Sequence, residues 1–237
     1  MIPKIIHYCW FGGKELPPLA KKCIASWRKF CPDWELRLWN ESNFPVEEYP
    51  YAAYCLRSRK WAFLSDFVRL KVVEEFGGVY LDTDVELVKS LDDLGENEAF
   101  FGFENPNYVA SGLGFGAVAG HPAVAAMVRE YETLEPDGTG EYPLRACPGL
   151  NTKALVKLGL KLDGREQIVA GAKILPADWL NPYDPATGEL KRTANTVSVH
   201  WYSQSWISPM ERLRTKIARP FHRFFGKDCF AWLRKTK

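Results

Sequence analysis

Apolar residues recur with strand spacing and then with helix spacing along the first part of the chain. A β-prone run at 1–8 comes first, a helical pattern opened by two prolines covers 17–30, and alternating apolar residues at 34–39 predict a second strand. The longest helical pattern, 58–76, ends at a pair of glycines and is followed by a third β-prone run at 79–81. Strands separated by helices predict an α/β fold with a parallel sheet and right-handed crossovers.

The rest of the chain continues this alternation of strands and helices. Strands are expected at 99–103 and 197–199, and helices at 121–131 and shortly after Cys147. The segment 41–54 contains two prolines and no clear periodicity, so it is expected to be a loop.

Two acidic side chains, Asp82 and Asp84, stand directly after the third strand pattern. In open α/β sheets, this end of the strands forms the ligand crevice. Two carboxylates so close together repel each other unless a cation or hydrogen-bond donors compensate, which favours a divalent ion beside a phosphate; a solvated turn is the alternative. Asp66 and Arg69, three residues apart on the preceding helix, have the spacing to hold one polar ligand or to form a surface ion pair.

The helix and the two aspartates together carry a family pattern, which reads Ser65-Asp66-x-x-Arg69 and then Gly77-Gly78-x-Tyr80-Leu81-Asp82-x-Asp84. It resembles the sugar-binding region of glycosyltransferases with a DXD motif, a group that includes fungal α-mannosyltransferases, bacterial capsule and lipopolysaccharide transferases and, more distantly, clostridial toxin domains. The resemblance implies a GT-A fold, which is a Rossmann-like α/β domain with a mainly parallel sheet flanked by helices. It also implies a nucleotide-sugar donor, a divalent metal and retention of anomeric configuration.

Several residues take donor-site roles from this resemblance. Trp10 ends the first strand beside a glycine pair, and its ring face suits stacking on a nucleobase, with a place in the core as the alternative. Tyr80 and Asp82 are expected to contact ribose or sugar hydroxyls. Asp66 and Arg69 are expected to hold the transferred sugar.

The segment around Cys147 departs from the family pattern. Family members carry a Gly-Pro stretch there, where this chain has Cys147-Pro148. Backbone amides and short polar side chains at a helix start can face an anionic ligand, so Asn151 is expected at the donor. The glycine-rich run 111–120 lacks a phosphate-loop lysine, and its glycines are expected to allow close backbone packing.

His200 follows the last strand and opens a Ser- and Trp-containing segment similar to the one that closes the metal site in family members. The resemblance makes it a metal ligand with Asp82 and Asp84, whereas a hydrogen-bonded structural histidine is the alternative. A mixed carboxylate and imidazole shell favours Mn²⁺ over Mg²⁺. The residues expected to donate to the diphosphate as a closing loop are Ser203, Ser205 and Trp206.

The implied reaction moves a hexose or an N-acetylhexosamine from a nucleotide-sugar, expected to be UDP-linked, to a saccharide or lipid-linked acceptor in bacterial surface polysaccharide synthesis. A front-side displacement assisted by the leaving phosphate is the expected route to retention, with Glu104 and Asp178 as alternative carboxylate nucleophiles. A metal-dependent phosphotransferase or hydrolase is one competing function, although it would need a second close pair of carboxylates at a strand end. A non-catalytic carbohydrate-binding protein is the other, although it would not need a metal for diphosphate.

Composition excludes several classes of protein. A chain of 237 residues with 46% hydrophobic residues is long enough for one substantial core. A formal net charge of +2 argues against nucleic acid as a partner. The six cysteines show no zinc-like spacing, and there is neither a signal-peptide pattern nor an apolar run long enough to span a bilayer. Reduced thiols and a cytoplasmic location are therefore expected.

Basic residues alternate with aromatic and aliphatic ones in the last segment, 211–237. We expect a catalytic domain at 1–210 and a separate helical tail at 211–237. The tail has the composition of an interfacial helix pair, which predicts reversible docking on an anionic membrane at the inner face of the plasma membrane. The alternative is an ordinary C-terminal helix that packs on the catalytic domain.

Overall fold

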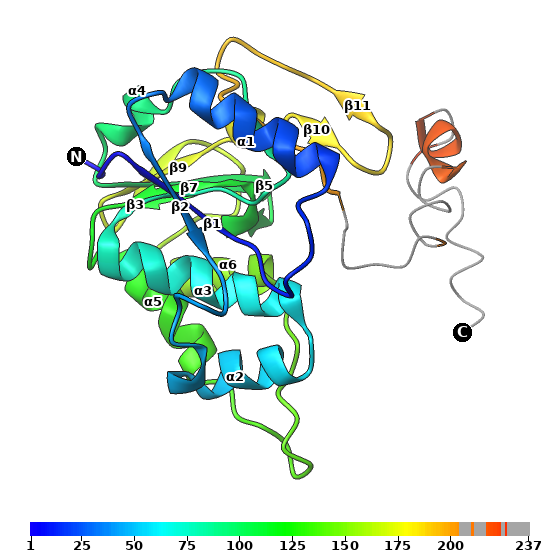
Figure 1. Cartoon of the computed structure of the whole chain (residues 1–237). Coiled ribbons are helices and arrows are strands. Elements are labelled where there is room, and N and C mark those ends of the chain that lie inside the picture. The colour runs from blue at the N-terminus through cyan, green and yellow to red at the C-terminus, as the bar shows by residue number, and fades with distance from the viewer. Residues whose placement is uncertain (204–209, 211–216, 224–225, 227–237) are drawn as a thin grey trace.

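A mixed eight-stranded sheet lies at the centre of this computed structural model, which describes residues 1–203, 210, 217–223 and 226 (Figure 1). Its strands are β1 (Ile5–Cys9), β2 (Glu35–Trp39), β3 (Gly78–Tyr80), β5 (Ala99–Asn105), β6 (Tyr108–Val109), β7 (Phe115–Ala117), β8 (Gln167–Val169) and β9 (Ala172–Leu175). The strand order is β2-β1-β3-β7-β5-β9-β8, and β6 pairs with β5 outside this path.

Most strands of the sheet run in one direction. β1 is parallel to both β2 and β3, and β5 is parallel to β9. β7 runs antiparallel between β3 and β5, and β8 runs antiparallel at the edge. The mainly parallel α/β sheet expected from the sequence is confirmed, with the reversal at β7 as a feature that the sequence pattern did not predict.

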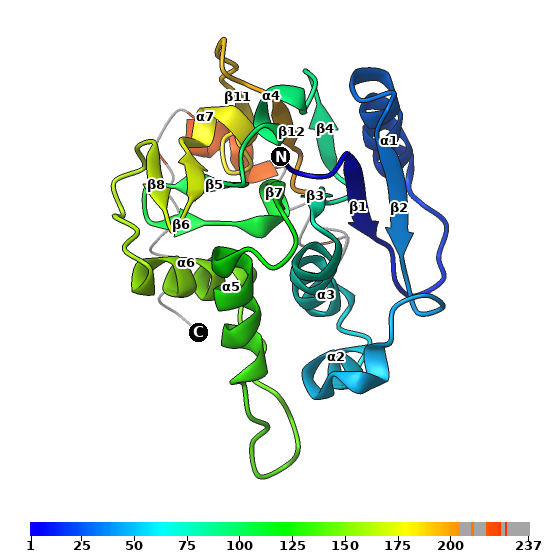
Figure 2. The same cartoon turned by 90° about the vertical axis from the view of Figure 1, so that its left-hand side faces the viewer.

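Helices cover both faces of the sheet. They are α1 (Pro18–Phe30), α2 (Pro50–Arg57), α3 (Trp61–Phe76), α4 (Asp92–Gly95), α5 (Pro122–Glu132), α6 (Cys147–Lys157) and α7 (Ala177–Leu180), with short 3-10 turns at Val46–Glu48 and Ser111–Leu113. Figure 2 shows α3, α5 and α6 below the sheet, with α2 beneath α3, and α1, α4 and α7 above it. Each layer encloses its own cluster of buried apolar side chains, so the sheet is sealed on both sides.

The junction between α3 and β3 depends on a glycine pair, as the sequence predicts. Gly77 has φ +64° and Gly78 φ +107°, conformations that side chains with a Cβ rarely adopt. A Cβ on Gly78 would lie 2.8 Å from Nε2 of His7. The His7 ring, fully buried, in turn lies 2.8 Å from the carbonyl oxygen of Gly77, so this turn fixes the start of β3 against β1.

The segment 41–54 is the main place where the structure differs from the predicted elements. Residues 50–57 form α2, whose first residue is a proline. Proline is tolerated there because the first helical amides have no intrahelical partner, so the same residue that indicated a loop begins a helix. Tyr51 of this helix is buried against the core, which stabilises a short helix that its own length would leave marginal.

Two small antiparallel sheets lie outside the central one. β4 (Val85–Leu87) pairs with β12 (Ser198–His200), and β10 (Tyr183–Asp184) pairs with β11 (Glu189–Leu190). In the first pair, His200 lies opposite Val85. This pairing brings the end of the described domain next to the aspartates that follow β3.

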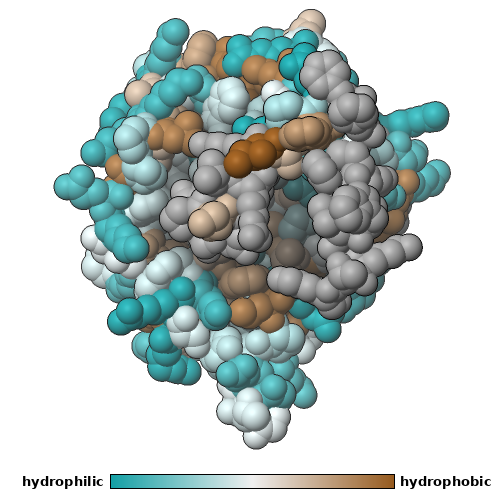
Figure 3. All heavy atoms as spheres, turned by 90° about the vertical axis from the view of Figure 1, so that its right-hand side faces the viewer, coloured by the Kyte–Doolittle hydropathy of each residue, from teal (hydrophilic) through white to brown (hydrophobic). Residues whose placement is uncertain are grey.

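The remaining sequence expectations concern thiols, the membrane and the tail. Cysteines 9, 23, 31, 55 and 147 are buried and unpaired. Among the described residues, every helix falls short of the length and apolar character that crossing a bilayer requires. Most of the expected tail, 211–237, lies outside the described residues. Residues 217–223 are helical, and Arg219 among them donates a 3.1 Å hydrogen bond to the carbonyl of Pro185. Figure 3 views the molecule from the right-hand side of Figure 1 and shows hydrophobic side chains near the centre of that face.

Candidate active site

A cavity of about 450 Å³ lies beside the ends of β1 and β3. Its walls come from the turns after β1, β3 and β12, from the first turns of α3, and from the start of α6. The lining residues with functional side chains include Trp10, Trp61, Ser65, Asp66, Arg69, Asp82, Asp84, Glu104, Cys147, His200, Tyr202 and Ser203. This is the crevice at the carboxyl ends of the strands where open α/β sheets bind ligands.

Asp82, Asp84 and His200 form one cluster on the wall of this cavity. Each offers a ligand atom, and these atoms all lie within 4.8 Å of one another. Nε2 of His200 lies 3.1 Å from Oδ1 of Asp84, while its Nδ1 is buried and makes no hydrogen bond to any described residue. Two carboxylates and an imidazole are ligands for divalent cations, so the donor set fits the expected divalent metal.

The charges of Asp84 and His200 depend on each other. Burial opposes ionisation of Asp84, but the His200 charge and hydrogen bonds from His200 and Ser203 outweigh it and hold the pKa of Asp84 well below its usual range. Burial likewise opposes the charged form of His200, but Asp84 raises the pKa of His200 above its usual value. Each group therefore favours the charged form of the other, and a bound divalent cation would supply the positive charge beside Asp84 in place of a protonated His200.

A second polar group, centred on Arg69, adjoins the cluster. Nη2 of the buried Arg69 lies 2.9 Å from Oδ1 of Asp66 and 3.0 Å from Oδ1 of Asp82. The Tyr80 hydroxyl donates a 3.0 Å hydrogen bond to the same oxygen of Asp82. The predicted pairing of Asp66 with Arg69 is therefore not a surface ion pair, because both line the cavity and Asp82 shares the guanidinium.

Burial dominates the titration of these two carboxyls. It raises the pKa of Asp66 to about 6, even though Arg69 acts in the opposite direction. Burial also raises the pKa of Asp82, against the influence of Arg69. Both carboxylates are thus poorly compensated and would be stabilised by polar ligand groups that donate hydrogen bonds to them.

Tyr80 and Asn151 occupy different positions from those expected. Tyr80 is 1% exposed, and its hydroxyl is directed to Asp82 and not to the cavity. Asn151 is fully buried, and its Oδ1 accepts a 3.0 Å hydrogen bond from the backbone amide of Ser111. Neither side chain lines the cavity, so the structure gives them supporting positions behind the residues that do.

Gly112 is a site residue that sequence reasoning missed. A Cβ at this position would lie 2.8 Å from Oδ2 of Asp82 and 3.1 Å from Nη1 of Arg69. The glycine therefore allows the 111–113 turn to close over the polar group, while Asn151 fixes that turn from behind. The only available signal was the glycine-rich run itself, for which close backbone packing was expected without a partner being identified.

Trp10 and Ser203 lie at the cavity, as expected. Trp10 is half-buried, and its Nε1 donates a 2.5 Å hydrogen bond to the carbonyl of Lys14, which leaves its ring on the lining. The backbone amide of Ser203 donates a 2.7 Å hydrogen bond to Oδ2 of Asp84. Ser205 and Trp206, the other residues of the expected closing loop, lie outside the described residues.

Tyr202 is a second residue that sequence reasoning missed. It has φ +48°, an uncommon conformation for a residue with a side chain, and its hydroxyl donates a 3.1 Å hydrogen bond to Oε1 of Glu104. Glu104 lines the cavity. The other suggested nucleophile, Asp178, does not line it, and its Oδ2 accepts a hydrogen bond from Thr193. Glu104 therefore stays a candidate nucleophile, whereas Asp178 is no longer one.

Comparison with known proteins identifies the central part of this site. Residues 17–101 match the family model described as glycosyltransferase sugar-binding region containing DXD motif. The chain therefore carries a DXD glycosyltransferase region. The matched range contains Asp66, Arg69, Asp82 and Asp84, whereas His200 lies beyond it and joins the DXD aspartates through the pairing of β4 with β12.

Fungal mannosyltransferases are among the curated proteins that are similar to this region. Inositol phosphoceramide mannosyltransferase 3 of Schizosaccharomyces pombe is 31% identical over 140 residues, which cover 54% of this chain and 36% of that protein. Mannosyl phosphorylinositol ceramide synthase CSH1 of Saccharomyces cerevisiae is 28% identical over 142 residues, covering 54% of this chain and 35% of that protein. The chain thus spans about a third of the length of these relatives.

The fold is also that of a solved glycosyltransferase. The PaToxG Glycosyltransferase structure superposes with a TM-score of 0.51 at 19% sequence identity, covering 66% of this chain and 68% of that one. At this identity the likeness concerns the fold alone, and it agrees with the GT-A architecture expected from the sequence.

Proposed function

We propose that this protein transfers a sugar from a nucleotide-sugar donor to a hydroxyl of an acceptor, with a divalent metal held by Asp82, Asp84 and His200. The observation that carries the proposal is the convergence of these three ligand groups on one cavity whose wall also bears the buried Arg69. A diphosphate needs both a cation and an enclosing polar wall, and this cavity offers positions for both.

The metal site follows from the chemistry of its three side chains. Mn²⁺ is the cation we propose, because a shell that includes an imidazole suits it better than Mg²⁺. When bound, the cation supplies charge stabilisation for the leaving diphosphate. Asp84 and His200 are held ready for it, since β4 and β12 fix them from two sides and Ser203 orients the second oxygen of Asp84.

The donor is held by lining residues that come from different elements, namely α3 and the turn after β1. Trp10 stacks on the base, and Asp66 and Arg69 hydrogen-bond the transferred sugar. Asp82 shares Arg69 with Asp66, so sugar binding and metal binding are linked through one guanidinium. The fungal relatives are named as mannosyltransferases, so a GDP-linked mannose joins UDP-linked hexoses and N-acetylhexosamines as a proposed donor.

Transfer proceeds by a front-side displacement with retention. The acceptor oxygen forms a bond to the anomeric carbon while the bond from that carbon to the diphosphate oxygen breaks, and the electron pair leaves with the nucleoside diphosphate. The acceptor proton passes to the leaving phosphate oxygen. Glu104 is the carboxylate in position to act as a nucleophile instead, since it lines the cavity and Asp178 does not.

The acceptor is a saccharide or a lipid-linked saccharide. The relatives carry inositol phosphoceramide in their names, which supports a phosphorylated, lipid-linked acceptor and gives no support to bacterial surface polysaccharide synthesis. Docking of the 211–237 tail on an anionic membrane remains part of this proposal on its composition alone. Co-sedimentation tests it: binding to anionic vesicles that is released by high salt supports it, and a protein that ignores such vesicles at low salt contradicts it.

The decisive experiment is thermal stabilisation by nucleotides. We expect UDP or GDP, but not ADP, to raise the melting temperature by about 5 °C at a hundredfold excess over Kd with Mn²⁺ present, and by clearly less without Mn²⁺. A phosphotransferase or hydrolase of other substrates would show no preference for these bases, and a carbohydrate-binding protein would show no metal dependence. Stabilisation by none of the three nucleotides in the presence of Mn²⁺ contradicts the proposal.

A further inference from the structure

A second cavity, of about 710 Å³, adjoins the first. Glu104, Ala146 and Pro148 line both cavities, so the two cavities share one wall. The second lies among β6, α5 and the start of α6, outside the residues that match the family model. Anything bound there would approach the donor cavity at Glu104.

One side of this second cavity is positively charged. Glu130 is only 5% exposed and forms ion pairs with two lysines. Nζ of Lys153 lies 2.7 Å from its Oε2, and Lys157 pairs with its Oε1. Burial opposes ionisation of Glu130, but these lysines outweigh it and hold the pKa of Glu130 below its usual range, so it is ionised at neutral pH. Lys157 does not line the cavity, but it shares the Glu130 carboxylate with Lys153, so Lys153 is only partly neutralised and has donors to spare.

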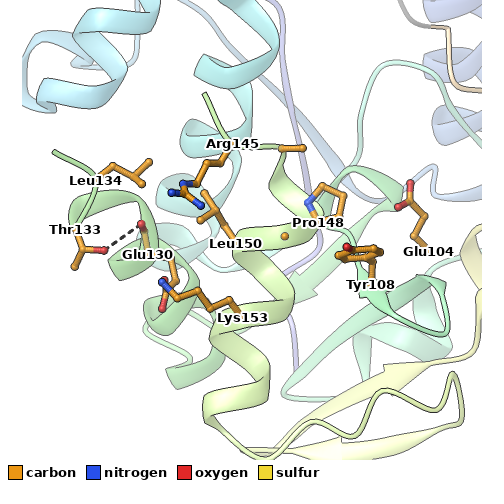
Figure 4. Close-up of a pocket in the computed structure, with 11 residues that line it drawn as sticks. Glu104, Tyr108, Glu130, Thr133, Leu134, Arg145, Pro148, Leu150 and Lys153 are labelled. Atoms are coloured by element: carbon orange, nitrogen blue, oxygen red, sulfur yellow. Dashed lines mark hydrogen bonds and ion pairs between the residues drawn. The ribbon is translucent and has the colours of Figure 1, made fainter. Parts of the chain in front are cut away.

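Arg145 adds a second positive charge, and no carboxylate among the described residues pairs with it. It lines the cavity on an exposed stretch just before α6. Figure 4 shows Arg145, Glu130 and Lys153 on one side of the cavity and Tyr108 and Glu104 on the other, with Pro148 between. The cavity is therefore cationic at its far side and carries a single carboxylate where it meets the donor cavity.

Tyr108 supplies a flat aromatic surface on the same side of the cavity as Glu104. Tyr108 lies on β6 and is 45% exposed. Pro148 lines the same cavity. An exposed aromatic ring on a cavity wall suits the apolar face of a sugar or polyol ring.

We propose that the second cavity is the acceptor subsite and that it selects a phosphorylated saccharide or polyol. The phosphate lies at Arg145 and Lys153, the ring packs on Tyr108, and the reacting hydroxyl is hydrogen-bonded to Glu104. This assignment rests on the proposed transferase function, because it takes the first cavity as the donor site. The chemistry favours a phosphate over a neutral group, since an unpaired guanidinium and an ammonium with free donors form charge-assisted hydrogen bonds to its oxygens.

Ligand-detected NMR on the full chain tests the proposal with three soluble probes. These are myo-inositol, which is neutral; myo-inositol 1-phosphate, a monoester; and glycerophosphoinositol, a diester like a lipid headgroup. We expect each phosphorylated probe to bind at least about tenfold more tightly than myo-inositol. Tighter binding of the diester assigns the phosphate to a lipid headgroup, and tighter binding of the monoester assigns it to a free sugar phosphate.

Three variants locate the binding. Arg145→Gln should remove most of the preference for phosphate while leaving myo-inositol binding unchanged, and Tyr108→Leu should weaken all three probes. Arg192→Gln is the matched control, because Arg192 is exposed and lines neither cavity. A phosphate preference that survives Arg145→Gln, or one that Arg192→Gln also removes, overturns the proposal, as does equal binding of all three probes.

The same samples separate this inference from the donor site. Arg145→Gln should leave the stabilisation by UDP or GDP with Mn²⁺ unchanged, since Arg145 does not line the donor cavity. If nucleotide stabilisation is present but no phosphate preference is found, the acceptor assignment fails alone. If nucleotides do not stabilise the wild-type protein, the proposed function fails with it.

Discussion

The backbone amide of Ser203 donates a 2.7 Å hydrogen bond to Oδ2 of Asp84, although the two residues are 119 positions apart in the sequence. The other carboxylate oxygen of Asp84 faces His200. The carboxylate of the second aspartate of the DXD motif is thus oriented by the last residue of β12 and by the segment that follows it. The metal site forms only once that late segment has docked on β4.

Replacement of Asp84 by asparagine should abolish transfer without unfolding the protein. Asparagine keeps the shape of the side chain but loses the negative charge that a divalent cation requires, so we expect transfer to fall at least about 100-fold. Donor turnover at saturating Mn²⁺ is the measurement, with circular dichroism to confirm the fold. Asp178→Asn is the control, because Asp178 is bonded to Thr193 away from the cavity; equal losses in the two variants would contradict the assignment.

A methyl group at Gly112 should damage the polar group around Arg69. In Gly112→Ala, the new Cβ would meet Oδ2 of Asp82 at 2.8 Å, which forces the 111–113 turn or the carboxylate to move. We expect a stability loss of about 1–3 kcal/mol and a larger proportional loss of activity. Chemical denaturation of this variant and of Gly138→Ala checks the expectation, since a Cβ on Gly138 meets no atom within 4 Å. Similar effects in both would show that the contact at Asp82 is not the cause.

Trp10 should be replaceable by another aromatic residue but not by alanine. If its ring stacks on the nucleobase, Trp10→Ala weakens nucleotide binding by about 1–3 kcal/mol, and Trp10→Phe retains most of the affinity. Calorimetric titration of nucleotide with Mn²⁺ present measures this. A lower melting temperature with unchanged nucleotide affinity would assign Trp10 to the core instead.

Stability should fall in mild acid because of His7. Burial lowers the pKa of His7 from 6.5 to about 4, and its neutral ring accepts from Trp39 and donates to the Gly77 carbonyl. Between pH 6.5 and 4, the unfolded chain therefore binds a proton at His7 that the folded chain does not bind. The contribution of His7 to the free energy of unfolding is complete above pH 6.5 and is lost as the pH falls toward 4. The loss amounts to about 3 kcal/mol at most.

Denaturant unfolding of the wild type and of His7→Gln across this pH range tests the effect. The glutamine variant lacks the titrating ring, so the difference in free energy of unfolding between the two proteins should shrink as pH falls from 6.5 to 4. A difference that stays constant with pH would show that His7 titrates normally in the folded protein.

The sequence predicted the elements that local pattern controls and missed those that depend on distant contacts. The glycine stop after α3 and the strands at 34–39 and 99–103 follow from periodicity and backbone preference, and the structure has them within a few residues. α2 was missed because its burial, and not its sequence pattern, stabilises it. The antiparallel β7 was missed because three residues carry too little periodicity to reveal a direction.

The candidate site divides in the same way. The DXD turn and the Asp66 and Arg69 pair lie close together in sequence, so a local pattern could find them. His200 was predicted as a metal ligand only through the family resemblance, because no local sequence pattern predicts that β12 pairs with β4. Gly112 and Tyr202 act through partners more than 20 residues away in the sequence, and no single-sequence signal identifies such partners.

Asp82, Asp84 and His200 should hold a divalent cation that binds together with a nucleoside diphosphate. Calorimetric titration of UDP and GDP with and without Mn²⁺, on the wild type and on His200→Ala, measures this coupling. We expect Mn²⁺ to tighten binding of one of these nucleotides at least about tenfold in the wild type, and His200→Ala to lose most of this gain while keeping its metal-free affinity. Equal nucleotide affinity with and without Mn²⁺ in the wild type, or an undiminished gain in His200→Ala, would contradict it.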